Sequence, residues 1–421
     1  MRFVVVIVFL GLLLFGCLNQ PISQNQSNPL GELYENTSTS INASQVSLPV
    51  SFQGNNNYVI VIPRSLIEGR SDVTSKGQRR VIEAHPDVFS RLNGVLFTAN
   101  DSVRSFFLAK SYGKFSLGGE VFVVNQDFPT VPSVIQELGS KVNWSGVKGV
   151  IAVHVGDCGS NIGARDGGGV PPQELETPNG KIAIGFIYIT ACGLYPLGQE
   201  NFPAWAWYVL AHELSHSILN MTGHANLVDS LPFYLQYNLT PSKLASVCSI
   251  SFNSSDPEIR SFTPSRGCKV VEYGDPFDIL GGGSSFNSSN QFSVYEKQRV
   301  GWIPETTTTT ATLTSLGNYD LRLYSHDLVS NEVDYLVHVK IPKGPYGFYS
   351  VEYRAELGDA FPSGGTRVLI RYGFQGGGTS LIAVLAPGET YTNDADKFSI
   401  NFNSVSQLNH VQAADITINL E

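Results

Sequence analysis

Charged residues and cysteines are few in this chain of 421 residues, and there are only two methionines, Met1 and Met221. Charged residues make up 15% of the chain and the formal net charge is −9, without a basic stripe, so the composition argues against a nucleic-acid partner. The glycine run 167–169 has neither the Lys-Ser/Thr of a phosphate loop nor the spacing of a dinucleotide fingerprint, and we interpret it as a mobile loop. With 42% hydrophobic residues, the chain can build sizeable cores, and its length favours two or three domains.

The N-terminus predicts export. Arg2 precedes an apolar run over 3–15 that ends in Leu14-Phe15-Gly16-Cys17, which is typical of a signal peptide with a lipobox-like end. Cys17 is therefore a lipid-anchor candidate, and an uncleaved anchor helix is the alternative, although the run is short for a spanning helix. Residues 18–50 are rich in Asn, Ser, Gln and Thr and predict a disordered polar tether. We expect the protein on the extracellular face of the cell membrane, or secreted.

The four other cysteines are spread singly along the chain, which suits neither a thiolate zinc site nor a reactive-cysteine site. An even number in an exported chain predicts two disulfides, with three connectivities open. Neighbour pairing is preferred: Cys158 with Cys192, and Cys248 with Cys268. Asn-x-Ser/Thr sequons fit a glycosylated exterior protein, and they begin at Asn25, Asn36, Asn42, Asn100, Asn143, Asn220, Asn238, Asn253 and Asn287.

The stretch 207–224 contains His-Glu-x-x-His and predicts a helix. His212 and His216, four residues apart, would share one face of that helix, with Glu213 beside them. Apolar residues recur every fourth position on the opposite side and predict a packed face: Leu210, Leu214 and Ile218. Pro203 suits the first turn of the helix and Gly223 suits its end.

This pattern predicts a hydrolytic zinc site. Zinc favours neutral imidazoles, and such a site uses three protein ligands and one water, whose pKa falls towards ~7. His212, His216 and His224 would be the ligands, and Glu213 would act as general base towards the water. An amphipathic helix with surface histidines is the alternative interpretation.

Further elements are expected around this helix. Strands are predicted over 58–63, 149–155 and 181–189, and a helix over 99–112 followed by a strand to about 124. The strand 181–189 precedes the predicted zinc helix and could offer its edge to an extended peptide. His154 lies in an apolar strand and is interpreted as a core residue with a satisfied ring nitrogen.

Three stretches resemble the metzincin clan of zinc endopeptidases, in particular the gametolysin-like and immune inhibitor A-like families. They are His212 to His216 with His224-Ala225-Asn226, then Tyr273 to Gly281, then Phe292 to Trp302. The segment 111–115, Ser-Tyr-Gly-Lys-Phe, is also similar, so the likeness spans residues 55–305. The resemblance implies a two-lobed α+β catalytic domain, three histidine ligands, a glutamate base, and zinc in a cleft below an edge strand that binds substrate.

The resemblance also implies a tight turn beneath the metal, from Asp278 to Gly281. Leu280 stands where the family has methionine, and a leucine of similar volume should cost little. The family spacing His-x-x-Gly-x-x-His is stretched by two residues here, with Leu219 at the glycine position. We favour His224 as third ligand, with Asp229 as the alternative.

Two further functional roles are open, one for Tyr295 and one for a group of acidic residues. Tyr295 could act as an electrophile near the zinc, and core packing beside Trp302 is the preferred alternative. Glu272, Asp275 and Asp278 could bind Ca²⁺, although turn formation is the commoner role of such aspartates.

The C-terminal part has the composition of a β-protein. Alternating or apolar runs at 335–340, 346–353, 366–372, 380–385 and 416–420 predict a β-sandwich, jelly-roll-like in form, over 306–421. Its histidines, His326, His338 and His410, show no ligand spacing. The predicted organisation is thus signal peptide 1–17, tether 18–50, catalytic domain 51–305 and sandwich 306–421.

Together these features predict an exported, membrane-tethered zinc metalloendopeptidase that acts on protein or peptide substrates. A catalytically inactive surface binding protein of the same fold is the main alternative, and a zinc hydrolase acting on another amide, such as a peptidoglycan peptide, is a third. Substrate specificity and oligomeric state are not predicted.

Overall fold

The computed structural model of the chain describes residues 50–73, 79–100, 102–155, 167–194, 202–220, 225–229, 250–252, 262–264, 269–271, 274–275, 277–281, 291–326, 335–344, 347–355, 366–374, 378–408 and 411–421. The predicted signal peptide 1–17, the lipid-anchor candidate Cys17 and the predicted tether up to residue 49 lie outside these ranges. Among the helices of the described ranges, none combines the length and the apolar character needed to cross a membrane.

A six-stranded mixed sheet forms the N-terminal part, in the order β1-β5-β2-β6-β8-β7. The four central strands are parallel, and both edge strands run antiparallel to their neighbours. The strands are β1 (Val50–Phe52), β2 (Asn56–Pro63), β5 (Leu117–Val124), β6 (Val147–His154), β7 (Gly167–Thr177) and β8 (Gly180–Thr190).

Burial on both faces explains the apolar run of β2. Ile60 and Ile62 belong to the core beneath helix α7 (Phe202–Leu219), whereas Val59 and Val61 belong to the core beneath α5 (Val131–Leu138). A strand covered on both faces needs apolar residues at successive positions. The strands predicted over 58–63, 149–155 and 181–189 are confirmed, with small shifts of their ends.

Helix α4 (Val103–Lys110) packs on the same face of the sheet as α7. The predicted helix 99–112 is therefore too long at both ends. Ser102 Oγ accepts a hydrogen bond from the N–H of Ser105 at 3.2 Å and caps the start, and Tyr112 has a φ of 56°, which ends the helical path. Shorter elements complete this part: α2 (Arg64–Glu68), β3 (Arg70–Val73), β4 (Arg79–Ile82), α3 (Val88–Asn93), η2 (Gly94–Thr98), η3 (Gly139–Lys141), η4 (Trp144–Gly146) and α6 (Ala191–Leu194).

The structure decides one alternative that sequence leaves open, in favour of an ordinary position within the sheet for residues 181–189, and corrects one interpretation, that of the glycine run. Strand β8 lies between β6 and β7, so residues 181–189 have no edge to offer; the edge strand is β7. Gly167, Gly168 and Gly169, interpreted as a mobile loop, form the first residues of β7 and pair with Ile189, Tyr188 and Ile187.

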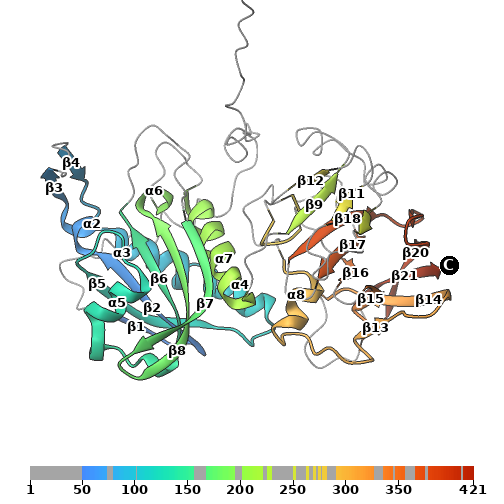
Figure 1. Cartoon of the computed structure of the whole chain (residues 1–421), viewed down its shortest axis with the longest axis horizontal. Coiled ribbons are helices and arrows are strands. Elements are labelled where there is room, and N and C mark those ends of the chain that lie inside the picture. The colour runs from blue at the N-terminus through green and yellow to red at the C-terminus, as the bar shows by residue number, and fades with distance from the viewer. Residues whose placement is uncertain are drawn as a thin grey trace, which may run out of the picture.

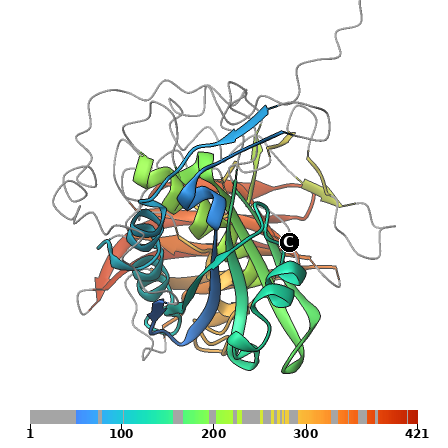
Figure 2. The same ribbon diagram turned by 90° about the vertical axis from the view of Figure 1, so that its left-hand side faces the viewer.

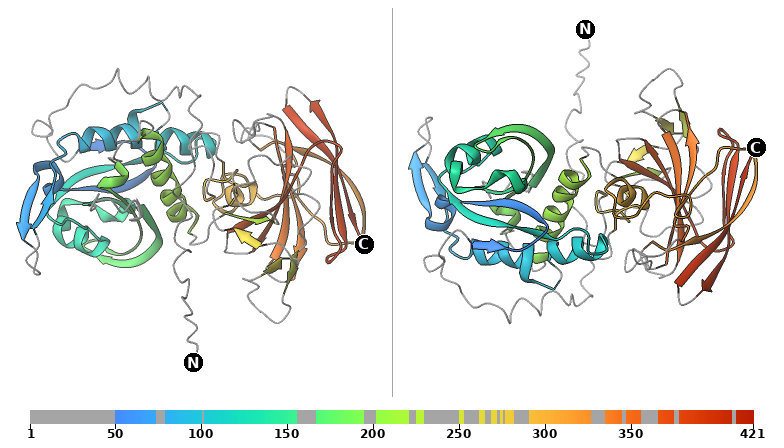
Figure 3. Two further views of the ribbon diagram at one scale, coloured as in Figure 1. Left: turned by 90° about the horizontal axis from the view of Figure 1, so that it is seen from above. Right: turned by 90° about the horizontal axis from the view of Figure 1, so that it is seen from below.

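The C-terminal part contains a seven-stranded and a four-stranded sheet that share one hydrophobic core. The large sheet has the order β12-β9-β18-β17-β16-β15-β13 and the small one β14-β21-β20-β19. Figure 3 shows the two sheets facing each other at one end of the molecule. Their strands are β9 (Asn226–Asp229), β12 (Lys269–Val271), β13 (Thr310–Thr312), β14 (Gly317–Tyr324), β15 (His338–Lys343), β16 (Gly347–Arg354), β17 (Arg367–Phe374), β18 (Thr379–Leu385), β19 (Thr390–Asn393), β20 (Phe398–Leu408) and β21 (Val411–Leu420).

The large C-terminal sheet includes two strands, β9 and β12, from the segment that follows α7. Asn226 and Leu227 of β9 pair in parallel with Ser380 and Leu381 of β18, and β12 pairs with the other side of β9. A pair of short strands, β10 (Ile250–Phe252) and β11 (Phe262–Pro264), lies between them in sequence. Residues before position 306 thus contribute to the sheet of the C-terminal part.

Helix α7 lies on the face of the N-terminal sheet that is turned towards the C-terminal sheets (Figure 1). Viewed from the N-terminal side, the blue-to-green strands stand in front of the orange and red ones (Figure 2). Helix α8 (Val294–Arg299) lies between the two parts. The chain is thus an α+β protein with several sheets, as predicted at that level.

Candidate metal and catalytic site

His212 and His216 lie one turn apart on α7, and both are nearly buried, with exposed fractions of 5% and 4%. Their Nε2 atoms are 3.2 Å apart. Two nitrogen ligands of a tetrahedral zinc ion, each ~2.0–2.1 Å from the metal, would lie roughly 3.3 Å from each other. The pair therefore fits two adjacent positions of a zinc site.

A backbone carbonyl fixes the orientation of the His212 ring. Nδ1 of His212 lies 2.8 Å from the carbonyl oxygen of Ile279. Because a carbonyl oxygen only accepts, Nδ1 carries the proton and donates it, which leaves the lone pair on Nε2. Histidine ligands of metals are held in this way by partners behind them. The turn predicted to lie beneath the metal thus contacts a predicted ligand directly.

That turn, from Asp278 to Gly281, is held by hydrogen bonds among its own residues. Asp278 Oδ1 accepts the N–H of Leu280 at 2.9 Å, and the N–H of Gly281 donates to the Asp278 carbonyl at 3.0 Å. The Leu280 side chain is fully buried in the core that contains α7. Tyr208, one turn before His212, donates its hydroxyl to the Gly281 carbonyl. Leucine therefore fills the position that the resemblance assigns to methionine.

Glu213 belongs to α7, and its side chain lies next to the edge strand β7. Burial raises the pKa of its carboxyl from 4.5 to about 7. A Cβ placed on Gly169 would come within 2.7 Å of the Glu213 carbonyl oxygen and 2.9 Å of its Oε2. A Cβ on Gly167 would meet Val209 Cγ1 at 2.4 Å. Glycine is needed at these two positions because β7 runs directly against the turn of α7 that carries Val209 and Glu213.

The end of α7 differs from the prediction. The last helical residue is Leu219, and Asn220 follows in the left-handed conformation with a φ of 51°. Gly223, the predicted end residue, lies outside the described residues. Asparagine tolerates this conformation better than other residues with side chains. Arg299 of α8 donates from Nη2 to the Asn220 carbonyl at 3.1 Å and satisfies a carbonyl at the helix end.

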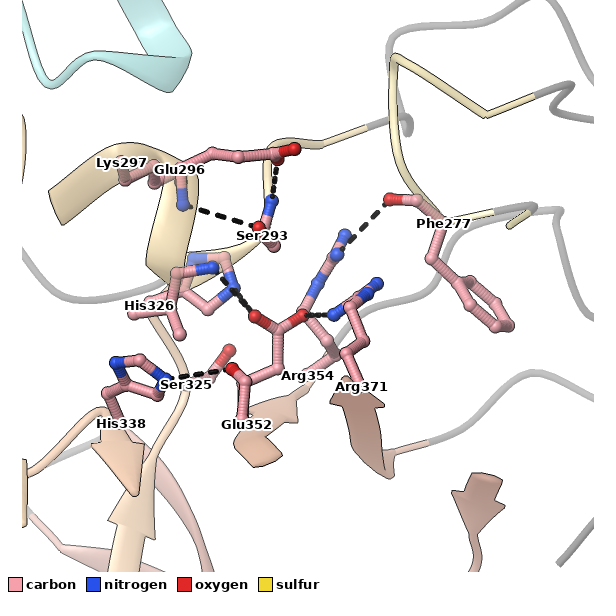
Figure 4. A network of polar contacts seen from close by, with 12 residues as sticks. Phe277, Ser293, Glu296, Lys297, Ser325, His326, His338, Glu352, Arg354 and Arg371 are labelled. Atoms are coloured by element: carbon pink, nitrogen blue, oxygen red, sulfur yellow. Dashed lines mark hydrogen bonds and ion pairs between the residues drawn. The ribbon is translucent and has the colours of Figure 1, made fainter. Parts of the chain in front are cut away.

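A buried polar network supports the turn from the C-terminal side (Figure 4). Arg371 of β17 binds Asp275 through Nε, at 2.8 Å from Oδ2, and Glu352 of β16 through Nη1. All three side chains have no exposed surface. Although burial acts in the opposite direction, the Arg371 guanidinium holds the pKa of the Glu352 carboxyl well below its usual range. Glu352 Oε2 also accepts the N–H of Val294, the first residue of α8, at 2.7 Å.

A second pair of buried carboxyls joins α8 to the turn. Burial, and then the adjacent Glu296 carboxyl, raise the pKa of Asp278 well above its ordinary value. Ser293 caps α8 reciprocally with Glu296, and the N–H of Ser293 also donates to Asp278 Oδ2 at 3.2 Å. These contacts tie the start of α8 to the turn beneath His212.

The aspartates of the predicted acidic cluster make turns. Asp275 Oδ1 accepts the N–H of Phe277 at 2.9 Å, and Asp278 makes the same contact with Leu280, two residues on in each case. The other oxygen of Asp275 binds Arg371. Glu272 lies outside the described residues, so the cluster is described only in part.

Tyr295 lies on α8 and faces the C-terminal sheet. Its hydroxyl donates to the carbonyl of Phe374 at 3.2 Å, and its ring packs on Phe348 with a centroid distance of 4.8 Å. Trp302, the predicted packing partner, instead packs against Phe107, Phe115 and Phe292. Tyr295 is thus in a packed position, but with a different neighbour.

His154 and His338, which lie outside the motif, make structural contacts. His154 binds the Pro129 carbonyl through Nε2 at 2.9 Å and stacks on Tyr188, which confirms the satisfied ring nitrogen. His338 is fully buried between Gln298 and Ser350, each 2.8 Å away, and burial lowers its pKa to about 3. Sequence spacing gave no sign that His338 and the network around Arg371 would lie behind the site. The signal available was the presence of the charged residues Glu352, Arg354 and Arg371 within largely apolar strand sequences.

Several predicted site residues lie outside the described part of the chain: His224, Glu272, Cys158, Cys248 and Cys268. The side chains of Cys192 and Asp229 are likewise not described, although Asp229 is placed in β9, opposite Lys269. Within the described residues, no group of three or more His, Cys, Asp or Glu side chains is positioned to hold a metal ion. Two of the three predicted ligands and the predicted base are thus placed together, and the third ligand is not placed.

Comparison with protein-family models, with curated proteins and with solved structures found no match.

Proposed function

We propose that the protein is a zinc metalloendopeptidase of the metzincin type, with His212, His216 and His224 as zinc ligands. The observation that carries the proposal is the convergence of the two Nε2 atoms at 3.2 Å beside the partly buried carboxyl of Glu213. Zinc held there would lower the pKa of a coordinated water towards ~7 and polarise a substrate carbonyl.

Glu213 acts as the general base in this proposal. Its carboxylate takes the proton of the attacking water and delivers it to the nitrogen of the leaving amine. The pKa of about 7 reflects burial without a cation, and a divalent cation nearby would lower it and keep the group ionised.

The edge strand β7 is the proposed substrate platform, because an extended peptide can add to a free sheet edge through main-chain hydrogen bonds. Pro171 and Pro172 interrupt this strand and have no N–H, and the register shifts between Val170 and Gln173. Pairing is therefore favoured along Gly167–Val170, which is the part that adjoins Glu213. The N-terminal sheet with α7 and the segment from β9 to α8 would form the two lobes on either side of the metal.

The location and attachment of the protein are proposed from the sequence alone. The lipobox-like segment ending at Cys17 would provide a lipid anchor, and the polar tether would hold the folded part away from the membrane. Two disulfides and glycosylation at some sequons would be compatible with that location. Calcium binding by the segment around Asp275 is not part of the proposal.

A non-catalytic binding protein is the alternative function. Binding alone would not require a glutamate between the two histidines, yet Glu213 is present and packed against the edge strand. A zinc hydrolase for a different amide would use the same residues and would differ in its substrate only.

The decisive experiment is hydrolysis of an unfolded protein such as casein by residues 18–421. We expect cleavage with zinc present, loss of cleavage after chelation, and recovery when zinc is added back. A protein that binds zinc stoichiometrically but cleaves neither casein nor a peptide library would support the binding-protein alternative instead.

The third ligand can be identified by two alanine variants. We expect His224→Ala to lower the zinc affinity by a larger factor than Asp229→Ala, because imidazole is the better zinc ligand and Asp229 lies in a strand of the C-terminal sheet. Competition with a chromophoric chelator measures both affinities. The reverse order would assign the third position to Asp229.

A further inference from the structure

Arg371 links the C-terminal sheet to the proposed metal site, although it lies far from the His-Glu-x-x-His motif in sequence. Its guanidinium is fully buried and binds Glu352 through Nη1 (Figure 4). Its Nε binds Asp275. A planar guanidinium that binds two carboxylates at once fixes their relative orientation, which the single point charge of a lysine does not do.

The contact with Asp275 continues towards the first zinc ligand. The Asp275 N–H donates to the Ala225 carbonyl at 3.3 Å, and the Ala225 N–H donates to the Leu280 carbonyl at 3.1 Å. Gly281 packs so closely that a Cβ there would come within 1.8 Å of the Asp275 carbonyl oxygen. The backbone around Asp275 is thus linked to the last two residues, Leu280 and Gly281, of the turn that carries Ile279.

Ile279 completes this path, because its carbonyl accepts the Nδ1 proton of His212 at 2.8 Å. The contact with Glu352 forms a second path. Glu352 binds the first N–H of α8, and Arg299 at the end of α8 binds the carbonyl of Asn220 at the end of α7. The two paths that start at Arg371 therefore reach the helix that carries both histidines, one at the His212 ring and one at the helix end.

We infer that Arg371 is a positioning residue for the metal site: it holds the turn that orients His212, so the C-terminal sheet is part of the machinery that binds the metal. This inference rests on the proposed zinc function. If the ion pairs of Arg371 only stabilised the fold, replacing Arg371 would lower the stability of the protein. The zinc affinity of the folded variant would then stay the same as that of the parent.

The test compares zinc affinity and thermal stability in variants of residues 18–421. Arg371→Lys keeps the positive charge but cannot bind Asp275 and Glu352 at the same time in the geometry of a guanidinium. Arg371→Met removes both the charge and the two contacts. Lys343→Met is the matched control, because Lys343 pairs with Asp396 elsewhere in the same β-rich part. Chelator competition measures the zinc affinity, and calorimetry of the zinc-free protein measures the unfolding midpoint.

We expect both Arg371 variants to bind zinc about 10 to 100 times more weakly than the parent, as is usual when the residues behind metal ligands are changed. Lys343→Met should bind zinc as the parent does, even where its unfolding midpoint falls as far. If Arg371→Met does not fold, Asp275→Asn provides the second test, since its amide keeps an acceptor for the Phe277 N–H but faces Arg371 with a donor.

The possible results distinguish the positioning role of Arg371 from the proposed zinc function. Parent-like zinc affinity in folded Arg371→Lys and Asp275→Asn would refute the positioning role and leave the proposed function intact. Failure of the parent itself to bind zinc would refute the proposed function, and the inference with it.

Discussion

Replacing Glu213 with Gln is expected to lower kcat/KM for peptide hydrolysis by between about 100-fold and 10,000-fold, while zinc remains bound. Glutamine keeps the size of the side chain and its position between α7 and β7, but it cannot accept the proton of the attacking water. The side chain is largely buried, so bulk water has little access to take over its role. Initial rates on a fluorogenic peptide, with metal content measured on the same samples, provide the measurement.

The matched control is Glu174→Gln, the same chemical change on an exposed part of the edge strand β7. We expect it to leave kcat/KM close to that of the parent. If Glu213→Gln retained most of the activity with zinc bound, another group would have to be the base.

Introducing a side chain at Gly169 is expected to have the second-largest effect. Alanine at this position would place its Cβ 2.7 Å from the Glu213 carbonyl oxygen and 2.9 Å from Oε2, so either the edge strand or the glutamate must move. Overpacking of this kind costs about 1–3 kcal/mol of stability, and a displacement of ~1 Å at a catalytic group can cost ~100-fold in rate. We therefore expect kcat/KM to fall by roughly 100-fold, measured with the same peptide assay.

Gly146→Ala is the control for the glycine-to-alanine change itself. A Cβ on Gly146 would meet nothing within 4 Å, so we expect a change in unfolding free energy within about 0.5 kcal/mol and unchanged turnover. Equal activity in the Gly169→Ala variant and the parent would mean that the contact between β7 and Glu213 does not position the base.

The parts of the fold that were predicted correctly are those with a strong local pattern. Strand β2 and its parallel neighbours are apolar at successive positions because both faces are buried, and sequence shows this directly. His212 and His216 share a face because helical geometry places residues four apart together. The turn at Asp278 carries its own signature, since its aspartate caps the backbone two residues later.

The errors arise where distant packing decides the local conformation. The run Gly167 to Gly169 matches no phosphate-binding or dinucleotide motif and is therefore interpreted from sequence as a mobile loop. In the structure these residues form a strand, and Gly167 and Gly169 lack side chains where helix α7 approaches that strand closely. The order of strands, with β7 outside β8, depends on hydrogen bonds that one sequence does not show. Helix α7 ends at Leu219, and the next residue, Asn220, has the left-handed conformation. A search of the sequence for a glycine at the helix end does not find this residue.

The buried network was the least predictable feature. Arg371, Glu352 and Asp275 come from three separate segments, and each residue alone resembles an ordinary charged residue in a β-rich sequence. Their energetic significance appears only when burial is known, because an unpaired charge in that position would be costly.

The pairing of β9 with β18 has a consequence for biosynthesis. It joins segments about 150 residues apart, and contacts of such separation form late because a long loop must close first. Arg371 lies on β17, immediately before β18, so the support behind His212 also arrives late in synthesis. A nascent chain that has already made the His-Glu-x-x-His helix therefore still lacks the strands behind the proposed metal site, and the proposed hydrolytic activity would emerge only after most of the polypeptide has been synthesised and folded.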